Sequence, residues 1–108
     1  MRKLQLLPVG TVDARLLEWL QHELYEKFRV PTEVLRPGID PAFARHAERQ
    51  QHHSSEILAR MQKYVNGSTW RLVGITELDL YIPILTFVFG EAQLGGTAAL
   101  VSYHRLRQ

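Results

Sequence analysis

The sequence predicts an α/β domain built on a mixed, mostly parallel, five-stranded twisted sheet with two main helices and one antiparallel edge strand. Short apolar runs bounded by Gly and Pro alternate with two longer stretches of helical periodicity, as in units with right-handed crossovers. The last two runs have no helix between them, so their strands are expected to be antiparallel neighbours. The expected elements are strand 4–10, helix 13–28, strand 32–35, helix 54–65, strand 70–76, strand 85–89 and strand 98–101.

The two predicted helices have the clearest signals. Apolar residues in 13–28 recur every three or four positions, as on one face of an amphipathic helix, and Thr11 or Asp13 can cap its N-terminus. The same spacing begins again at Ser54. Segment 40–53 shows no periodicity, so two alternatives stay open for it, a helical extension or a mobile surface loop.

The stretch 76–106 holds the two apolar runs that are expected to form the last strands, 85–89 and 98–101. Both are too short for buried helices, are bounded by Pro or Gly, and are rich in aromatic or β-branched residues. We expect this stretch to be the sheet-forming centre of the domain, with Phe87 and Phe89 on one face and in the core.

Composition limits the function classes. The 108 residues, 45% of them apolar, are expected to form a single domain over residues 1–108. The 13 basic and 11 acidic residues are mixed along the chain, so nucleic-acid binding is not expected. The chain has no cysteine, and its N-terminal apolar stretch is too short for a signal peptide, so the default expectation is a cytoplasmic protein without a membrane span.

Several histidines and carboxylates have side chains that could bind a metal ion. His22 begins a sequence like a helical zinc motif, but the position four residues on is Glu26 where that motif has a second histidine. His52 and Glu56 would share a face if their segment were helical, yet no third ligand follows from the spacing. We expect these histidines and His104 to be surface residues, and assign no catalytic and no metal-binding residue. The histidines of this region form a loose cluster with two carboxylates in the sequence, namely His46, Glu48, His52, His53 and Glu56.

Glu77 and Asp79 precede the predicted edge strand. A carboxylate pair acts in acid–base chemistry only where a pocket separates the two pKa values. An Asp in a connection more commonly binds nearby backbone amides, so loop capping is the expectation here.

The stretch 76–106 also resembles a known family. The sequence Asp79-Leu80-Tyr81, then Pro83, then the heptapeptide 87–93, and finally Val101-Ser102 and Arg105-Leu106 are similar to the archaemetzincins, a family of zinc metallopeptidases. Thr86 departs from the family pattern, where asparagine is the more common residue.

The resemblance implies a metzincin-like N-terminal subdomain. The family holds its zinc on a helix reading H-E-x-x-H-x-x-G-x-x-H, and no such sequence occurs in this chain. The expectation is therefore that the chain is the N-terminal part of such a peptidase, lacks the zinc ligands and the catalytic glutamate, and by itself neither binds catalytic zinc nor cuts peptides. A truncated product, a frameshift and a split protein completed by a C-terminal half all stay open.

The best candidate site is the edge strand that begins at Phe87. An edge strand leaves backbone N–H and C=O groups unpaired, and an extended peptide can add to it as one more strand. In metzincins the corresponding strand holds the substrate backbone antiparallel, so the resemblance places Phe89, Gly90, Glu91, Ala92 and Gln93 in a substrate cleft. Gly90, without a side chain, would permit a close backbone approach. The competing interpretation is a strand whose alternate residues only pack on helices.

Two functions follow. The first is the substrate-cleft-forming part of an archaemetzincin-like zinc metallopeptidase. The alternative is a non-catalytic module that binds a peptide or a partner protein at the exposed edge strand. The resemblance also implies uncovered apolar surface near the last two strands, and hence self-association of the isolated chain.

Overall fold

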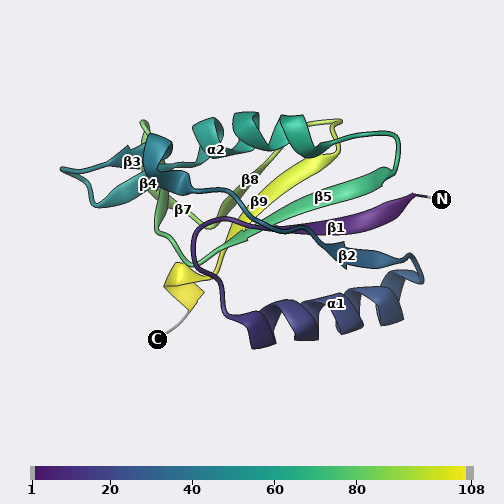
Figure 1. Ribbon diagram of the computed structural model, residues 1–108. Helices are drawn as coiled ribbons and strands as arrows, with labels where there is room; N and C mark the ends of the chain where they lie inside the picture. Colours follow the sequence, from purple (N-terminus) through teal and green to yellow (C-terminus); the bar gives the residue numbers. More distant parts are fainter. Residues whose placement is uncertain (1, 107–108) are drawn as a thin grey trace.

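The computed structural model describes residues 2–106 and shows a five-stranded sheet with one helix against each face (Figure 1). The strand order is β2-β1-β5-β9-β8, and only β8 is antiparallel to its neighbour. This confirms the predicted mixed, mostly parallel sheet with two helices and one antiparallel edge strand. The elements of this layer are β1 (Lys3–Pro8), α1 (Ala14–Phe28), β2 (Thr32–Val34), α2 (Ser54–Met61), β5 (Thr69–Thr76), β8 (Gly90–Ala92) and β9 (Ala98–Ser102).

Helix α1 forms as its sequence predicts. The Asp13 carboxylate accepts a hydrogen bond of 2.8 Å from the Arg15 backbone N–H and caps the N-terminus, and the left-handed Arg29, with φ 54°, ends the helix. The buried Leu17 anchors α1 against Leu4 and Leu6 on one face of the sheet. This face holds the smaller of the two apolar clusters.

Helix α2 covers the opposite face, which holds the larger cluster. Ile57, Leu58 and Met61 are buried there against residues of β1, β5 and β9, among them Leu72 and Leu100. The helix is shorter than the predicted 54–65, because the chain continues after Met61 as a 3₁₀ turn, η2 (Gln62–Tyr64). The core thus lies on both faces of β1 and β5, whereas β9 contributes Ala98 and Leu100 to the larger cluster.

A second, four-stranded sheet was not predicted. Its strands are β3 (Arg45–His46), β4 (Gln51–His53), β6 (Leu80–Ile82) and β7 (Leu85–Val88), in the order β3-β4-β6-β7, with a 3₁₀ turn, η1 (Pro41–Ala44), before β3. Segment 40–53 is therefore neither a helical extension nor a loop, since most of it is a hairpin. These polar residues show no apolar alternation, and they form strands because His52 and His53 pair with Leu80 and Tyr81 of β6.

The apolar run 85–89 is not the sheet-forming centre that the sequence indicated. Leu85 is 49% exposed and Phe89 is 52% exposed, and the run forms the outer strand of the second sheet. The chain then passes at Phe89 into the main sheet, so the antiparallel edge strand is the three-residue β8. The rings of Phe87 and Phe89 pack edge to face, with centroids 5.3 Å apart, outside the core.

Among residues 2–106, no helix combines the length and the apolar character that a membrane crossing needs.

We predict that Leu80→Ala destabilises the protein by about 2–5 kcal/mol, because Leu80 is fully buried and links the second sheet to the larger core cluster. Urea unfolding at neutral pH measures the free energy of unfolding. Leu94→Ala is the matched control, since Leu94 is fully exposed and its loss should change stability by less than about 0.5 kcal/mol. Equal effects of the two substitutions would contradict the assignment of Leu80 to the core.

Candidate functional site

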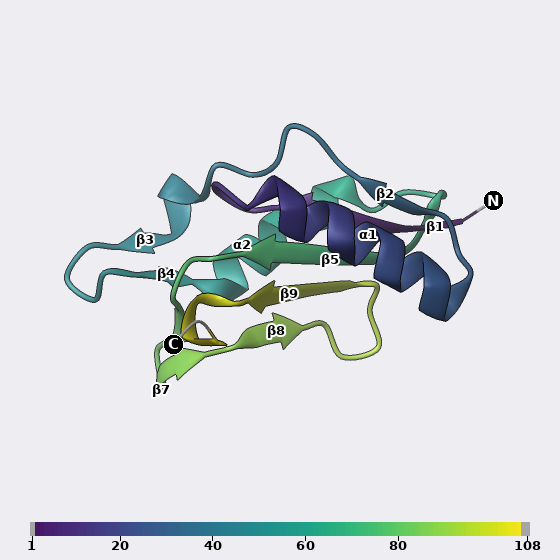
Figure 2. The same ribbon diagram turned by 90° about the horizontal axis from the view of Figure 1, so that it is seen from below.

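Strand β8 is an open edge of the main sheet (Figure 2). The Gln93 N–H donates to the Ala98 carbonyl at 3.1 Å, and the Ser102 N–H donates to the Phe89 carbonyl at 2.8 Å. Backbone groups alternate sides along an antiparallel strand, so the N–H and C=O groups of Gly90 and Ala92 point away from β9. These outward groups can pair with one further extended strand.

Gly90 is required by the sheet itself. A Cβ atom at this position would overlap the carbonyl oxygen of Leu100 in β9. The close backbone approach expected at Gly90 therefore occurs, but the approaching backbone belongs to β9. The residue fixes the point at which the chain joins the main sheet after Phe89.

Glu91 ties the edge strand to helix α2. Its carboxylate accepts hydrogen bonds from the Ser54 hydroxyl at 2.6 Å and from the Ser55 hydroxyl at 2.9 Å. Both serines belong to the first turn of α2, where a negative charge is favourable. Glu91 thus holds β8 in place and does not project from the open edge.

Four of the five predicted site residues line one shallow groove. The groove has a volume of about 370 Å³ and is bounded by Phe89, Gly90, Glu91, Ala92, Ala99, Leu100 and Val101. Gln93 does not belong to it, because its carbonyl accepts from the Gly96 N–H in the turn between β8 and β9. The lining is mostly apolar, which suits the side chains of an extended peptide.

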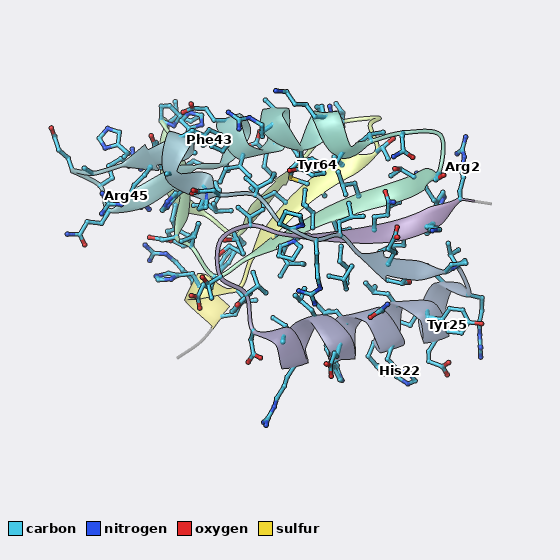
Figure 3. The ribbon with its side chains drawn as sticks, in the orientation of Figure 1. Arg2, His22, Tyr25, Phe43, Arg45 and Tyr64 are labelled. Carbon is cyan, nitrogen blue, oxygen red and sulfur yellow. The ribbon has the colours of Figure 1, made fainter. Side chains whose placement is uncertain are left out.

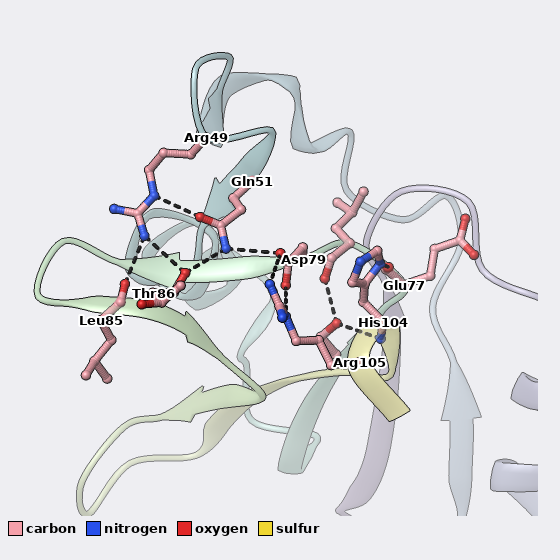
Figure 4. A network of polar contacts seen from close by, with 10 residues as sticks. Arg49, Gln51, Glu77, Asp79, Leu85, Thr86, His104 and Arg105 are labelled. Carbon is pink, nitrogen blue, oxygen red and sulfur yellow. Dashed lines mark hydrogen bonds and ion pairs between the residues drawn. The ribbon is translucent and has the colours of Figure 1, made fainter. Parts of the chain in front are cut away.

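A polar cluster near this edge was not predicted (Figure 4). The Asp79 carboxylate accepts from Arg105 Nε at 2.9 Å, from Arg105 Nη2 at 2.8 Å and from Gln51 Nε2 at 3.0 Å. Asp79 is therefore not the loop cap that was expected, since its side chain joins β4 to the 3₁₀ turn η3 (His104–Leu106). No local sequence signal could find this cluster, because its members lie 26 and 28 positions from Asp79.

The cluster shifts two pKa values. The hydrogen bonds from Arg105 hold the pKa of Asp79 below its usual value, although partial burial opposes them. The same contact raises the pKa of Arg105. The pair is charged at neutral pH, and the Asp79 side chain is only 12% exposed.

The histidines do not form a metal site in the part of the chain that is described. His52 lies on β4 opposite Leu80, whereas Glu56 lies on α2, so these two side chains do not share one helix face. His53 instead caps α2, with Nδ1 accepting from the Glu56 N–H at 3.3 Å. Burial lowers the pKa of His52, and the positive charge of Arg45 lowers it further. Within residues 2–106 no three His, Cys, Asp or Glu side chains are grouped to hold a metal ion.

The remaining histidines do not extend the site. His22 lies on the side of α1 that faces away from the sheet and is exposed, as expected (Figure 3). His104 is also exposed, and its Nδ1 lies 3.0 Å from the Glu77 carbonyl oxygen.

Comparison with known proteins gives one consistent family. The chain is 40% identical to an archaemetzincin of Methanocaldococcus jannaschii over 101 residues, which are 93% of this chain and 53% of that protein. The crystal structure of the archaemetzincin from Archaeoglobus fulgidus, complexed with malonate, superposes with a TM-score of 0.81 at 32% identity and covers 98% of this chain and 63% of that one. No protein-family model matches the chain.

A third likeness concerns the fold alone. The structure of a zinc-dependent peptidase from Methanocorpusculum labreanum has a TM-score of 0.74 at 24% identity, over 95% of this chain and 64% of that one. The chain spans about half the length of the first curated relative.

We predict that Gly90→Ala lowers the free energy of unfolding by about 1–3 kcal/mol, because the new methyl group overlaps the Leu100 carbonyl. The matched control is Gly67→Ala, whose Cβ meets nothing within 4 Å. Chemical unfolding of both variants measures the difference. A Gly90→Ala protein as stable as the control would show that β8 does not pack on β9 in this register.

We predict that Asp79→Asn is destabilising at neutral pH and that its effect disappears in acid. The folded-state pKa of Asp79 is lowered, so the ionised carboxylate contributes stability above the unfolded-chain pKa of about 4, and this contribution is lost as the pH falls through the folded-state pKa. Thermal unfolding from pH 7 to pH 3 measures both proteins. A difference between them that stays constant on acidification would contradict the role of the Asp79 charge.

Proposed function

Because the chain belongs to the archaemetzincin family, we propose that its edge strand β8 holds an extended peptide for a zinc-dependent peptidase of that family. One observation carries the proposal. The N–H and C=O groups of Gly90 and Ala92 face an open edge beside an apolar groove. A peptide running antiparallel to β8 would extend the main sheet by one strand.

Zinc chemistry is not assigned to these residues. The described chain does not fit a zinc ion, because residues 2–106 contain no group of three ligand side chains. We therefore assign it no catalytic step. Its proposed contribution is to bind and orient the peptide backbone, which favours reaction at a catalytic group supplied elsewhere.

The expected affinity is low. Gly90 and Ala92 offer four outward backbone groups, and each net hydrogen bond contributes about 0.5–1.5 kcal/mol before the entropy of ordering the peptide is subtracted. Four such bonds total about 2–6 kcal/mol, so dissociation constants in the millimolar range or weaker are expected once that entropy is subtracted. Side-chain contacts in the groove lined by Phe89, Ala99 and Val101 would supply the rest of the binding free energy.

A second candidate function is a non-catalytic module that docks a partner protein, or a second copy of the chain, at the same edge. Exposed apolar side chains near β8 favour it, among them Phe89, Leu94 and Val101. Sedimentation velocity over a range of concentrations separates the two functions. A dimer that dissociates when peptide is added would show that partner and peptide compete for β8.

We predict that Ala92→Pro weakens peptide binding at least tenfold while the fold is kept. Proline removes an N–H that points outward, and edge strands tolerate proline at such positions. Ala92→Ser, which keeps the N–H, is the matched control and should bind within about twofold of the wild type. Chemical-shift titration with an uncharged, valine- and threonine-rich octapeptide measures both, and circular dichroism checks the fold. Unchanged binding by the proline variant would overturn pairing at β8.

A further inference from the structure

Within residues 2–106, the partners that hold the Arg49 side chain in place are all neutral groups. Its guanidinium lies 3.9 Å from the centroid of the Tyr81 ring. Its Nε donates to the Gln51 side-chain oxygen at 2.8 Å, and its Nη2 donates to the carbonyl oxygens of Leu85 at 2.8 Å and Thr86 at 3.2 Å. Arg49 forms no ion pair with a carboxylate of residues 2–106. The side chain is thus preorganised without a counter-charge.

This guanidinium borders a hollow with a net positive charge. The hollow has a volume of about 530 Å³ and is lined by Arg49, Gln51, Asp79, Pro83, Ile84, Leu85, Thr86 and Arg105. Its charged residues are two arginines and one aspartate, and both oxygens of that aspartate accept hydrogen bonds from Arg105 or Gln51. In Figure 4 one terminal nitrogen of Arg49 points away from all its partners. That nitrogen, Nη1, can donate a charge-assisted hydrogen bond to a carboxylate of a peptide.

The hollow is connected to the peptide edge by two aromatic rings. The Arg105 guanidinium lies 4.0 Å from the centroid of the Phe87 ring, and Phe87 packs on Phe89. Phe89 directly precedes β8, which begins at Gly90. A peptide antiparallel to β8 therefore points its C-terminal end from Ala92 past Gly90 toward this hollow. Residues of such a peptide that extend beyond the Gly90 pair would run toward the hollow, since a strand advances about 3.3 Å per residue.

We propose that this hollow binds a carboxylate of the peptide, with Arg49 as the principal cation. The carboxylate lies on the C-terminal side of the residues paired with β8, and it is either an acidic side chain or the peptide's own terminus. The inference rests on the proposed function, and it adds a preference for acidic or C-terminal segments to a backbone interaction that by itself reads little sequence.

Three peptides with one uncharged extended core test the proposal. The first ends in an amide, the second in a free carboxylate, and the third in an amide with a glutamate three residues beyond the core. Chemical-shift titration of the full chain should show the second or the third bound about tenfold more tightly than the first. The advantage should shrink at high salt, because exposed charges are screened. The second and third peptides distinguish a terminal carboxylate from an acidic side chain.

Arg49→Gln should abolish this advantage and leave the affinity for the uncharged peptide unchanged. The matched control is Arg60→Gln, because Arg60 also stacks on an aromatic ring, 4.0 Å from the centroid of Phe43, but lies outside the hollow. Arg49→Lys, which keeps the charge, should retain part of the advantage and serves where the glutamine variant fails to fold.

The outcomes separate this inference from the proposed function. Equal binding of all three peptides by the wild type, or an advantage that survives Arg49→Gln, overturns the carboxylate site alone. Undiminished binding of all three peptides by Ala92→Pro overturns pairing at β8, whether or not Arg49 matters.

Discussion

The Asp79 carboxylate is the interaction on which the arrangement of the two sheets depends. It stands just before β6 and binds Gln51 of β4 and Arg105 of η3, which follows the last strand of the main sheet. Three segments distant in sequence therefore meet at one charge. Because that charge is largely buried and fully hydrogen-bonded, its desolvation is compensated. Asp79 binds Arg105 and Gln51, and among residues 2–106 no carboxylate forms an ion pair with Arg49.

The edge strand illustrates a compromise between access and protection. Long apolar edges promote aggregation, and short strands reduce this risk. Strand β8 has only three residues, and its one charged residue, Glu91, binds the serines of α2 and so does not guard the edge. Brevity is thus the main protection that β8 has. A peptide paired with a strand of this length, as proposed, would be held only weakly.

The sequence was sufficient for the main layer and insufficient for the second sheet. Helices α1 and α2 follow from apolar spacing, and the parallel pairing of β1, β2 and β5 follows from the alternation of strands and helices. The hairpin β3–β4 has no apolar alternation from which it could be predicted. It forms strands because β4 pairs with β6, which lies about 28 residues further along the chain. The prediction that run 85–89 forms the centre of the main sheet was wrong, because aromatic and β-branched residues favour strands but do not indicate which sheet a strand joins. The groove residues were found through family resemblance, whereas Arg49 and Asp79 act through contacts that no local pattern encodes.

The two binding features divide affinity and selectivity between them. Backbone pairing at Gly90 and Ala92 is indifferent to side chains, so it cannot by itself choose one peptide over another. A fixed guanidinium at the C-terminal end of the same path responds to charge and to distance along the peptide. In the proposed complex, the position of a carboxylate along the peptide decides whether it reaches the hollow, because a strand advances about 3.3 Å per residue. If the proposed site exists, the separation of β8 and the hollow would set where along an acidic peptide the backbone is held.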